Sequence, residues 1–227
     1  GQMLIGDQTQ SNLLRVNTEV VDGVEQGSVM PFIDSLESGV MRPVFLPDGS
    51  LLLGQTGRGW QAKGGHVASM QRIVWDGKTV APAIQSTHAT SNGFTLKLTQ
   101  PLSDSIDSAA LQKLLAVESW VYRDAPDYGS DELGKAMERI TNISISADRK
   151  QITMSLAELG HASVHPQQTA RVYHITLNNQ QLFKDAAAAD YSDDKNRIII
   201  SKIRSSRKKP TLQYWFYEGG KEEKSDR

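Results

Sequence analysis

The sequence contains no cysteine, and this absence excludes several kinds of chemistry. Without a thiol, the chain forms no disulfide, no cysteine nucleophile and no zinc–thiolate centre. It also lacks any run of about 20 apolar residues, the length that a membrane-spanning helix needs. Its charges nearly cancel, with 25 basic and 26 acidic residues, so no overall field favours nucleic acid or an anionic membrane.

Familiar catalytic motifs are missing as well. The chain has no H-E-x-x-H zinc motif, no phosphate-binding loop and no G-x-S-x-G elbow. Its histidines are scattered, at His66, His88, His161, His165 and His174. His161 and His165 are spaced for one helical face, but the flanking glycine and proline disfavour a helix. We therefore expect no metal site in this chain.

What the first third does contain is a series of short β-like runs separated by tight turns. Asp22-Gly23 is a hairpin signal, and Pro47-Asp48-Gly49 combines the fixed φ of proline with a glycine at positive φ. The predicted strands cover Met3–Asp7, Leu13–Val21, Val24–Ile33, Pro43–Leu46, Ser50–Leu53 and Met70–Trp75.

The stretch from Gly39 to Gly77 is the most informative part of the chain. It follows the order strand, tight turn, strand, glycine-rich loop, strand, which is the layout of a β-propeller blade. The preceding residues echo it, with an apolar run, a glycine-polar loop (GDQTQSN) and a strand that contains Arg-Val. Fewer than two repeats of roughly 45 residues are present. Residues 1–78 therefore predict the terminal blades of an incomplete propeller.

A boundary is expected near Lys78–Pro82, after which the pattern changes. Residues 79–185 contain alternating runs such as Phe94–Leu98 and Val172–Leu177, which fit a small antiparallel sandwich. Ser105 or Asp107 can cap one helix, and Leu133–Arg139 predicts a further helical turn.

The last segment, residues 186–227, predicts a strand at Arg197–Ile203 and a second, aromatic one at Leu212–Tyr217, followed by a charged tail. The basic run Lys202–Lys209 beside these aromatics resembles single-stranded nucleic-acid binders. A short basic run in a near-neutral chain is more often a surface strand or a linker, so we expect no nucleic-acid partner.

Three segments carry a resemblance to a known family: GQMLIGDQTQSNLLRV, GVMRPVFLPDGSLLLGQTGRGW and MQRIVWDGK. They resemble large secreted multidomain bacterial proteins whose propeller is related to the glucose/sorbosone dehydrogenases. The later segments AVESWVY, DYGSDE, ITNISISADRKQITMSL and ARVYHITLN resemble the Ig-like domain that follows that propeller. The resemblance implies a secreted or periplasmic location.

In the related sugar dehydrogenases, basic residues on propeller loops bind pyrroloquinoline quinone. The resemblance implies that Arg42, with the Gln55–Arg58 loop, lines such a cofactor mouth in the parent protein. The chain departs from that pattern at Gln8-Thr9-Gln10, where the dehydrogenases carry a basic residue. As an alternative, Arg42 and Arg58 satisfy loop carbonyls or pair with an acid such as Asp48.

Two further groups of residues are candidate ligand contacts. Asp7, Gln8 and Gln10 have the oxygen and amide groups that suit sugar hydroxyls or Ca²⁺, although such residues are also ordinary turn formers. Trp60 follows two glycines and either stacks on a sugar ring or packs against the blade edge.

The sequence thus predicts an all-β protein, in which one or two propeller blades precede an Ig-like sandwich with a short helical insertion. We expect a non-catalytic structural or recognition segment without its own cofactor. Its partners would be the remaining blades and neighbouring domains, or a second copy through exposed blade edges. The alternatives are part of a quinoprotein-type sugar dehydrogenase and a carbohydrate-binding module.

Overall fold

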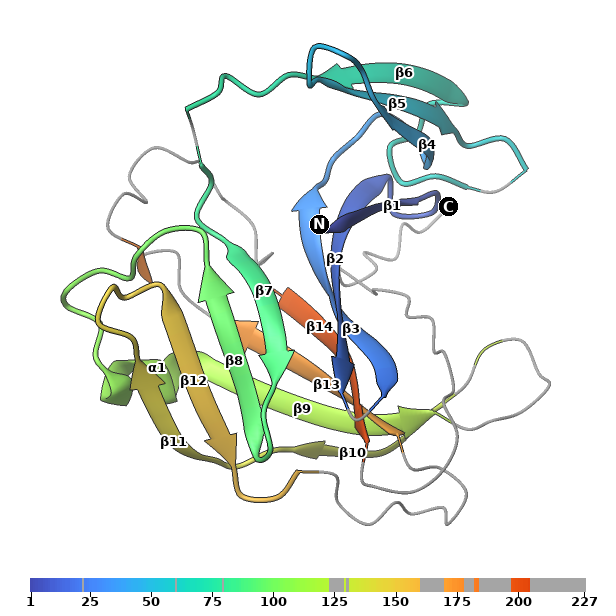
Figure 1. Cartoon of the computed structure of the whole chain (residues 1–227). Coiled ribbons are helices and arrows are strands. Elements are labelled where there is room, and N and C mark those ends of the chain that lie inside the picture. The colour runs from blue at the N-terminus through green and yellow to red at the C-terminus, as the bar shows by residue number, and fades with distance from the viewer. Residues whose placement is uncertain are drawn as a thin grey trace, which may run out of the picture.

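The computed structural model describes residues 1–21, 23–59, 61–78, 80–122, 129, 131–159, 170–177, 182–183 and 197–204, with Ala170 and residues 197–204 through their backbone. In this part of the chain, antiparallel strands form three sheets, accompanied by one short helix (Figure 1). The predicted all-β class is therefore confirmed.

The largest sheet has seven strands in the order β1-β2-β3-β14-β13-β9-β10. Their bounds are β1 (Met3–Asp7), β2 (Asn12–Val21), β3 (Val24–Ile33), β14 (Arg197–Arg204), β13 (Ala170–Leu177), β9 (Leu115–Tyr122) and β10 (Glu132–Met137). This sheet takes strands from each of the three segments that the sequence predicts as separate units, because β14 pairs with β3 and β13. The strand expected at Arg197–Ile203 is confirmed as β14, while Leu212–Tyr217 lies outside the described residues. The division into domains stays a prediction.

The second sheet has four strands in the order β11-β12-β8-β7, and the third has three in the order β4-β5-β6. The bounds are β11 (Ile140–Ile145), β12 (Gln151–Leu156), β8 (Gly93–Leu98) and β7 (Ile84–Ala89), then β4 (Val40–Phe45), β5 (Leu51–Thr56) and β6 (Ala68–Ile73). Figure 1 shows β4–β6 at one end of the molecule, joined to β7 by the connection after β6.

Both predicted hairpin turns are present. At the first, Val21 of β2 pairs with Val24 of β3, and Gly23 has φ of 75°. Gly49 has φ of 81°, in the left-handed region that glycine reaches without a Cβ clash. The strand, turn, strand, loop, strand order expected for Gly39–Gly77 is therefore confirmed as β4–β6.

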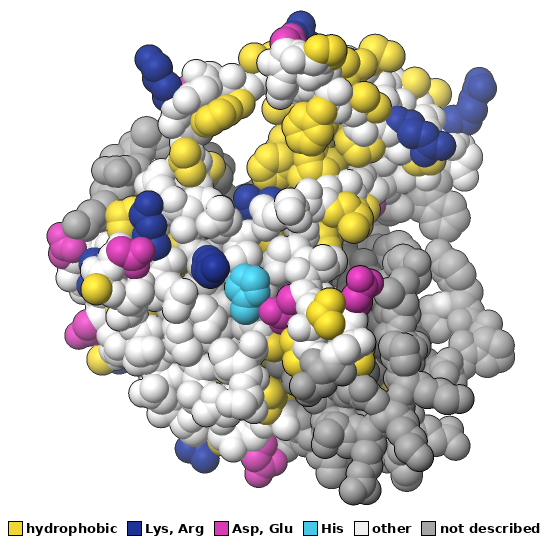
Figure 2. Space-filling view, viewed as in Figure 1, with side chains coloured by type: hydrophobic (Ala, Val, Ile, Leu, Met, Phe, Trp, Pro, Cys, Tyr) yellow, Lys and Arg dark blue, Asp and Glu magenta, His cyan; other side chains and the backbone are white. Residues whose placement is uncertain are grey.

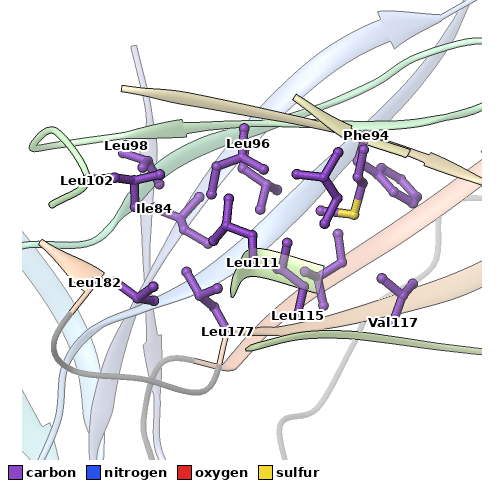
Figure 3. Packing of buried hydrophobic residues seen from close by; sticks show 14 of the residues in the cluster. Ile84, Phe94, Leu96, Leu98, Leu102, Leu111, Leu115, Val117, Leu177 and Leu182 are labelled. Carbon is purple, nitrogen blue, oxygen red and sulfur yellow. The ribbon is translucent and has the colours of Figure 1, made fainter. Parts of the chain in front are cut away.

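The main core lies between the four-stranded sheet and the β9 and β13 part of the seven-stranded sheet (Figure 3). β8 contributes alternate residues from one side, and α1 (Ser108–Leu114) closes one end with Leu111. The residues labelled in Figure 3 are Ile84, Phe94, Leu96, Leu98, Leu102, Leu111, Leu115, Val117, Leu177 and Leu182. Asp107 caps the helix, since its side chain accepts a hydrogen bond from the Ala110 N–H at 2.7 Å.

The helical turn predicted at Leu133–Arg139 is wrong. Leu133–Met137 belong to β10, which pairs antiparallel with β9 and shows a register shift between Leu133 and Ala136. The apolar spacing imitates a helix because this bulge breaks the strict alternation of a strand. Gly134, at φ of 60°, also disfavours a helical turn and suits the bulge.

A smaller hydrophobic cluster holds the three-stranded sheet against the seven-stranded sheet. Its buried members are Leu13, Leu36, Val40, Leu51 and Leu53, and Leu4, Ile33 and Ile73 pack against them. Apart from Leu36, which lies between β3 and β4, these residues come from β1 to β6, so the first six strands share this cluster although they are divided between two hydrogen-bonded sheets.

Candidate functional site

Of the three residues predicted at a cofactor mouth, Arg42 and Gln55 lie on neighbouring strands but point in opposite directions. Arg42 lies exposed on β4, where its Nη1 donates to the Met41 carbonyl at 3.0 Å. Gln55 is buried on β5, and its Nε2 donates to the Ser38 carbonyl at 2.9 Å. Arg42 pairs with Gly54, the neighbour of Gln55, so the two side chains leave opposite faces of the sheet.

Arg58, the third of these residues, is exposed in the loop after β5. Its backbone N–H donates to the Thr56 hydroxyl at 3.1 Å. Asp48 pairs with Arg72 instead of Arg42 or Arg58. Hydrogen bonds from Ser50, followed by the charge of Arg72, lower the pKa of Asp48. Quinone binding by this loop region stays a prediction.

The predicted ligand residues Asp7, Gln8 and Gln10 lie in the β1–β2 turn. Asp7 Oδ1 accepts a hydrogen bond from the Gln10 N–H at 2.9 Å, which uses this carboxylate to close the turn. The same turn is held against the glycine-rich loop, since the Lys63 N–H donates to the Thr9 carbonyl at 2.8 Å. Trp60 lies outside the described residues, so sugar stacking at that position stays a prediction.

A more elaborate polar arrangement lies where β2 crosses β7, the edge strand of the four-stranded sheet. Gln2 Nε2 donates to the Gln85 carbonyl at 2.6 Å, and Arg15 Nη2 donates to the Ile84 carbonyl at 2.5 Å. Burial lowers the pKa of Arg15. These side chains bond backbone groups on the free edge of β7, which prevents that edge from pairing with another strand.

Asn17 of β2 bonds both backbone groups of Thr87 in the middle of β7. Its Nδ2 donates to the Thr87 carbonyl at 3.0 Å, and its Oδ1 accepts from the Thr87 N–H at 3.1 Å. Ser28 also donates to Asn17 Oδ1. Asn17 is only 6% exposed, so the two Thr87 backbone groups and the Ser28 hydroxyl form their hydrogen bonds with Asn17 and not with water.

Replacing Asn17 with alanine is expected to lower the free energy of unfolding by about 2–3 kcal/mol, because the buried partner groups on Thr87 and Ser28 lose their hydrogen bonds. Urea unfolding measures the change. Thr18→Ala is the matched control, since Thr18 is exposed on the same strand and its loss should change stability by no more than about 0.5 kcal/mol. Equal losses in the two variants would contradict this role for Asn17.

Beside this contact, a serine, a histidine and a glutamate form a hydrogen-bonded chain. Ser86 Oγ lies 3.1 Å from His88 Nε2, and His88 Nδ1 lies 3.0 Å from Glu19 Oε2. The glutamate accepts the proton on Nδ1, which leaves Nε2 to accept the serine hydroxyl. The order is that of a nucleophile, a base and an orienting acid.

Glu19 also accepts two hydrogen bonds besides the one from His88. Its Oε1 accepts the Ala89 N–H at 2.8 Å and the Gln26 Nε2 at 3.2 Å. The side chains of His88 and Glu19 are 36% and 19% exposed, so the site opens to solvent while its carboxylate is held in place. Figure 2 shows a histidine open on this face of the molecule, with acidic and basic side chains beside it.

Reasoning from sequence missed this cluster, although it recorded His88. The available signal was the Ser-x-His spacing of Ser86 and His88, which puts both side chains on one face of a strand. The contribution of Glu19 carries no local signal, because it lies 69 residues from His88 in the sequence.

A second polar cluster is buried between β9, β10 and β13. Arg171 Nη2 donates to Ser119 Oγ and to the Gly134 carbonyl, each at 2.8 Å, and Ser119 donates to Glu138. All three side chains are less than 8% exposed. The guanidinium is therefore used to join β13 to the bulge in β10, and this cluster is structural.

Among the described residues, no three His, Asp or Glu side chains gather in a way that could hold a metal ion. In the same part of the chain, no helix is long and apolar enough to cross a membrane. In comparisons with known proteins, no family model, no curated protein and no solved structure matched this chain.

Proposed function

We propose that this chain is a structural segment of a larger β-protein, in which β4–β6 form a blade that packs into a stack of sheets. The seven-stranded and four-stranded sheets, which include the strands of the predicted Ig-like sandwich together with β1–β3, anchor that blade from one side. The observation that carries the proposal is the presence of apolar residues on both faces of the three-stranded sheet.

The inward face of this sheet is already covered. Leu51 and Leu53 are 5% and 0% exposed, and they pack in the smaller hydrophobic cluster with Leu13 of β2. Side chains alternate along a strand, so Leu52 and Gly54 point to the opposite face.

The outward face carries apolar residues that water still reaches. Val44 pairs with Leu52, and Met70 pairs with Gly54, so all of them lie on this second face. Val44 and Met70 are 53% and 72% exposed. Figure 2 shows hydrophobic side chains gathered over the end of the molecule where β4–β6 lie in Figure 1.

A sheet with apolar residues on both faces fits a position between two other sheets, as in a repeat protein whose units each cover the next. The strand order within Gly39–Gly77 and the resemblance to propeller proteins support the same arrangement. The secreted or periplasmic location, the quinone site and carbohydrate binding stay predictions.

The test compares the 227-residue chain with the longer protein that this proposal requires. In the 227-residue chain, the double change Val44→Glu and Met70→Glu should alter stability by about 0.5 kcal/mol or less, since both positions are exposed. In the longer protein, the same change should cost about 3 kcal/mol or more, because it places two charges in a covered apolar contact.

Thermal and urea unfolding of both proteins give the comparison, and Ser144→Glu on β11 serves as the control. Small effects of the double change in both proteins would contradict the proposal. So would a finding that the gene encodes nothing beyond these residues.

A further inference from the structure

We propose that Ser86, His88 and Glu19 form a nucleophilic site that transfers short acyl groups from carboxylic esters to water. This site is independent of the structural role of β4–β6, because it lies on β7 and β2. Ser86 and His88 form a Ser-x-His pair on β7, and Glu19 lies on β2. The Ser86–His88 hydrogen bond is 3.1 Å long and the His88–Glu19 hydrogen bond is 3.0 Å long.

The contacts made by His88 add to a strand that is bound in other ways. The backbone of β7 is already held by Asn17 at Thr87 and by Glu19 at the Ala89 N–H. The bond from Ser86 to His88 joins two side chains on the same strand, so it contributes nothing to the pinning of β7 on β2. A hydrogen-bonded Ser–His–Glu series that lies beside these backbone contacts is a candidate for chemistry.

The backbone beside the serine contains an irregularity that sets which face its side chain lies on. The pairing of β7 with β8 shifts register between Ile84 and Ser86, so that Ile84 and Thr87 both face the core. Ser86 and His88 are consequently both turned to the outer face of the sheet. Bulges of this kind often redirect a side chain beside an active site.

A cation lies opposite the proposed nucleophile. Lys97 of β8 is the direct cross-strand partner of Ser86, and opposite residues project from the same face with Cβ atoms about 5 Å apart. In the proposed site, this cation would stabilise negative charge that develops on a substrate oxygen. Thr95, opposite His88, bonds Thr153 at 3.3 Å, so the positions across from His88 carry short side chains, and we expect a small acyl group such as acetyl.

The reaction follows from the order of these groups. Ser86 Oγ bonds to the carbonyl carbon of the ester while its proton moves to His88 Nε2, and the carbonyl electron pair becomes an oxyanion near Lys97. When that intermediate collapses, the bond to the alcohol oxygen breaks, and the alcohol leaves with the proton from His88. Water then attacks the acyl-serine in the same way, which releases the carboxylic acid and restores Ser86.

Glu19 acts through the imidazole and not on the ester. Its carboxylate holds Nδ1–H and keeps Nε2 free to accept a proton, and the Ala89 and Gln26 bonds fix its own orientation. Glu19 is therefore a positioning residue, while Ser86 and His88 are the catalytic residues.

Covalent labelling of the 227-residue chain with a fluorophosphonate probe tests the proposal, followed by peptide mapping and by hydrolysis of 4-nitrophenyl acetate. We expect label on Ser86, no label at that position in Ser86→Ala, and labelling at least about 100-fold slower in His88→Gln. Ser144→Ala is the matched control, because Ser144 is exposed on β11 of the same sheet and pairs with Thr153. It should react like the unchanged chain.

Circular dichroism and the melting temperature establish that each variant is folded, so a loss of labelling reports on the site. Labelling spread equally over several serines would overturn the proposal, as would an unchanged rate in His88→Gln. A folded chain labelled no faster than the denatured chain would overturn it as well.

Discussion

Replacing Phe94 with alanine should lower the free energy of unfolding by about 3–5 kcal/mol, one of the two largest losses expected from a single substitution in this protein. Phe94 is fully buried on β8, and its ring lies edge-to-face with Tyr173 of β13, with centroids 5.1 Å apart. The contact joins the four-stranded sheet to the seven-stranded sheet. Truncation therefore removes the aromatic pair and leaves a cavity between the two layers.

Urea unfolding measures this loss, and the melting temperature should fall by about 10 °C, since 1 kcal/mol corresponds to about 2–4 °C in a protein of this size. Phe45→Ala is the control, because the same atoms are removed from a side chain that is 66% exposed at the end of β4. It should cost about 0.5 kcal/mol or less. If both truncations cost the same, the layers do not meet at Phe94.

The strands that the sequence predicted well are those with strict alternation or a strong turn between them. The Phe94–Leu98 run alternates cleanly, and β2 and β3 meet at Asp22-Gly23, so both are read directly from residue types. β10 was predicted as a helical turn and β7 was not predicted at all, and the pairing of each with its neighbour contains a register shift that interrupts the period of two. In β7, Ile84 and Thr87 are both buried although an unbroken strand would put them on opposite faces.

The order of the strands in the sheets could not be predicted from local sequence patterns. β14 lies between β3 and β13, so a strand from late in the chain joins the two parts of the seven-stranded sheet. Such long-range pairing depends on which edges remain open after the nearer hairpins form, and a single sequence holds no local trace of it. The Ser86, His88 and Glu19 cluster has the same origin, because it exists only where β2 crosses the edge of β7.

For the predicted ligand residues, the sequence indicated the location correctly but not the role of each side chain. Polar residues of the β1–β2 turn were correctly located in a turn, but their chemistry was open to two interpretations. Asp7 closes the turn by accepting the Gln10 N–H, and Gln55 is buried against the Ser38 carbonyl. Residue type alone does not distinguish a side chain that binds a ligand from one that satisfies its own backbone.

Replacing Gly39 with alanine should release the three-stranded sheet from its place on the β1–β2 turn. A Cβ added at Gly39 would lie 2.1 Å from the Gln8 carbonyl oxygen and 2.8 Å from its carbonyl carbon. These are backbone atoms, so no side-chain rotation relieves the clash, and the turn or the start of β4 must move. We expect a loss of about 3 kcal/mol, at the upper end of ordinary overpacking.

The loss should also be local. Hydrogen exchange followed by mass spectrometry should show faster exchange in β4–β6, while β8 and β12 stay protected by the separate main core. Gly54→Ala is the matched control on β5, because the nearest atom to its added Cβ is the Arg42 Cβ at 3.5 Å, an ordinary contact. It should leave exchange unchanged. Equal exchange in the two variants would show that the Gly39 contact does not hold the three-stranded sheet, whereas selective release would show that this sheet is joined to the β1–β2 turn at this glycine.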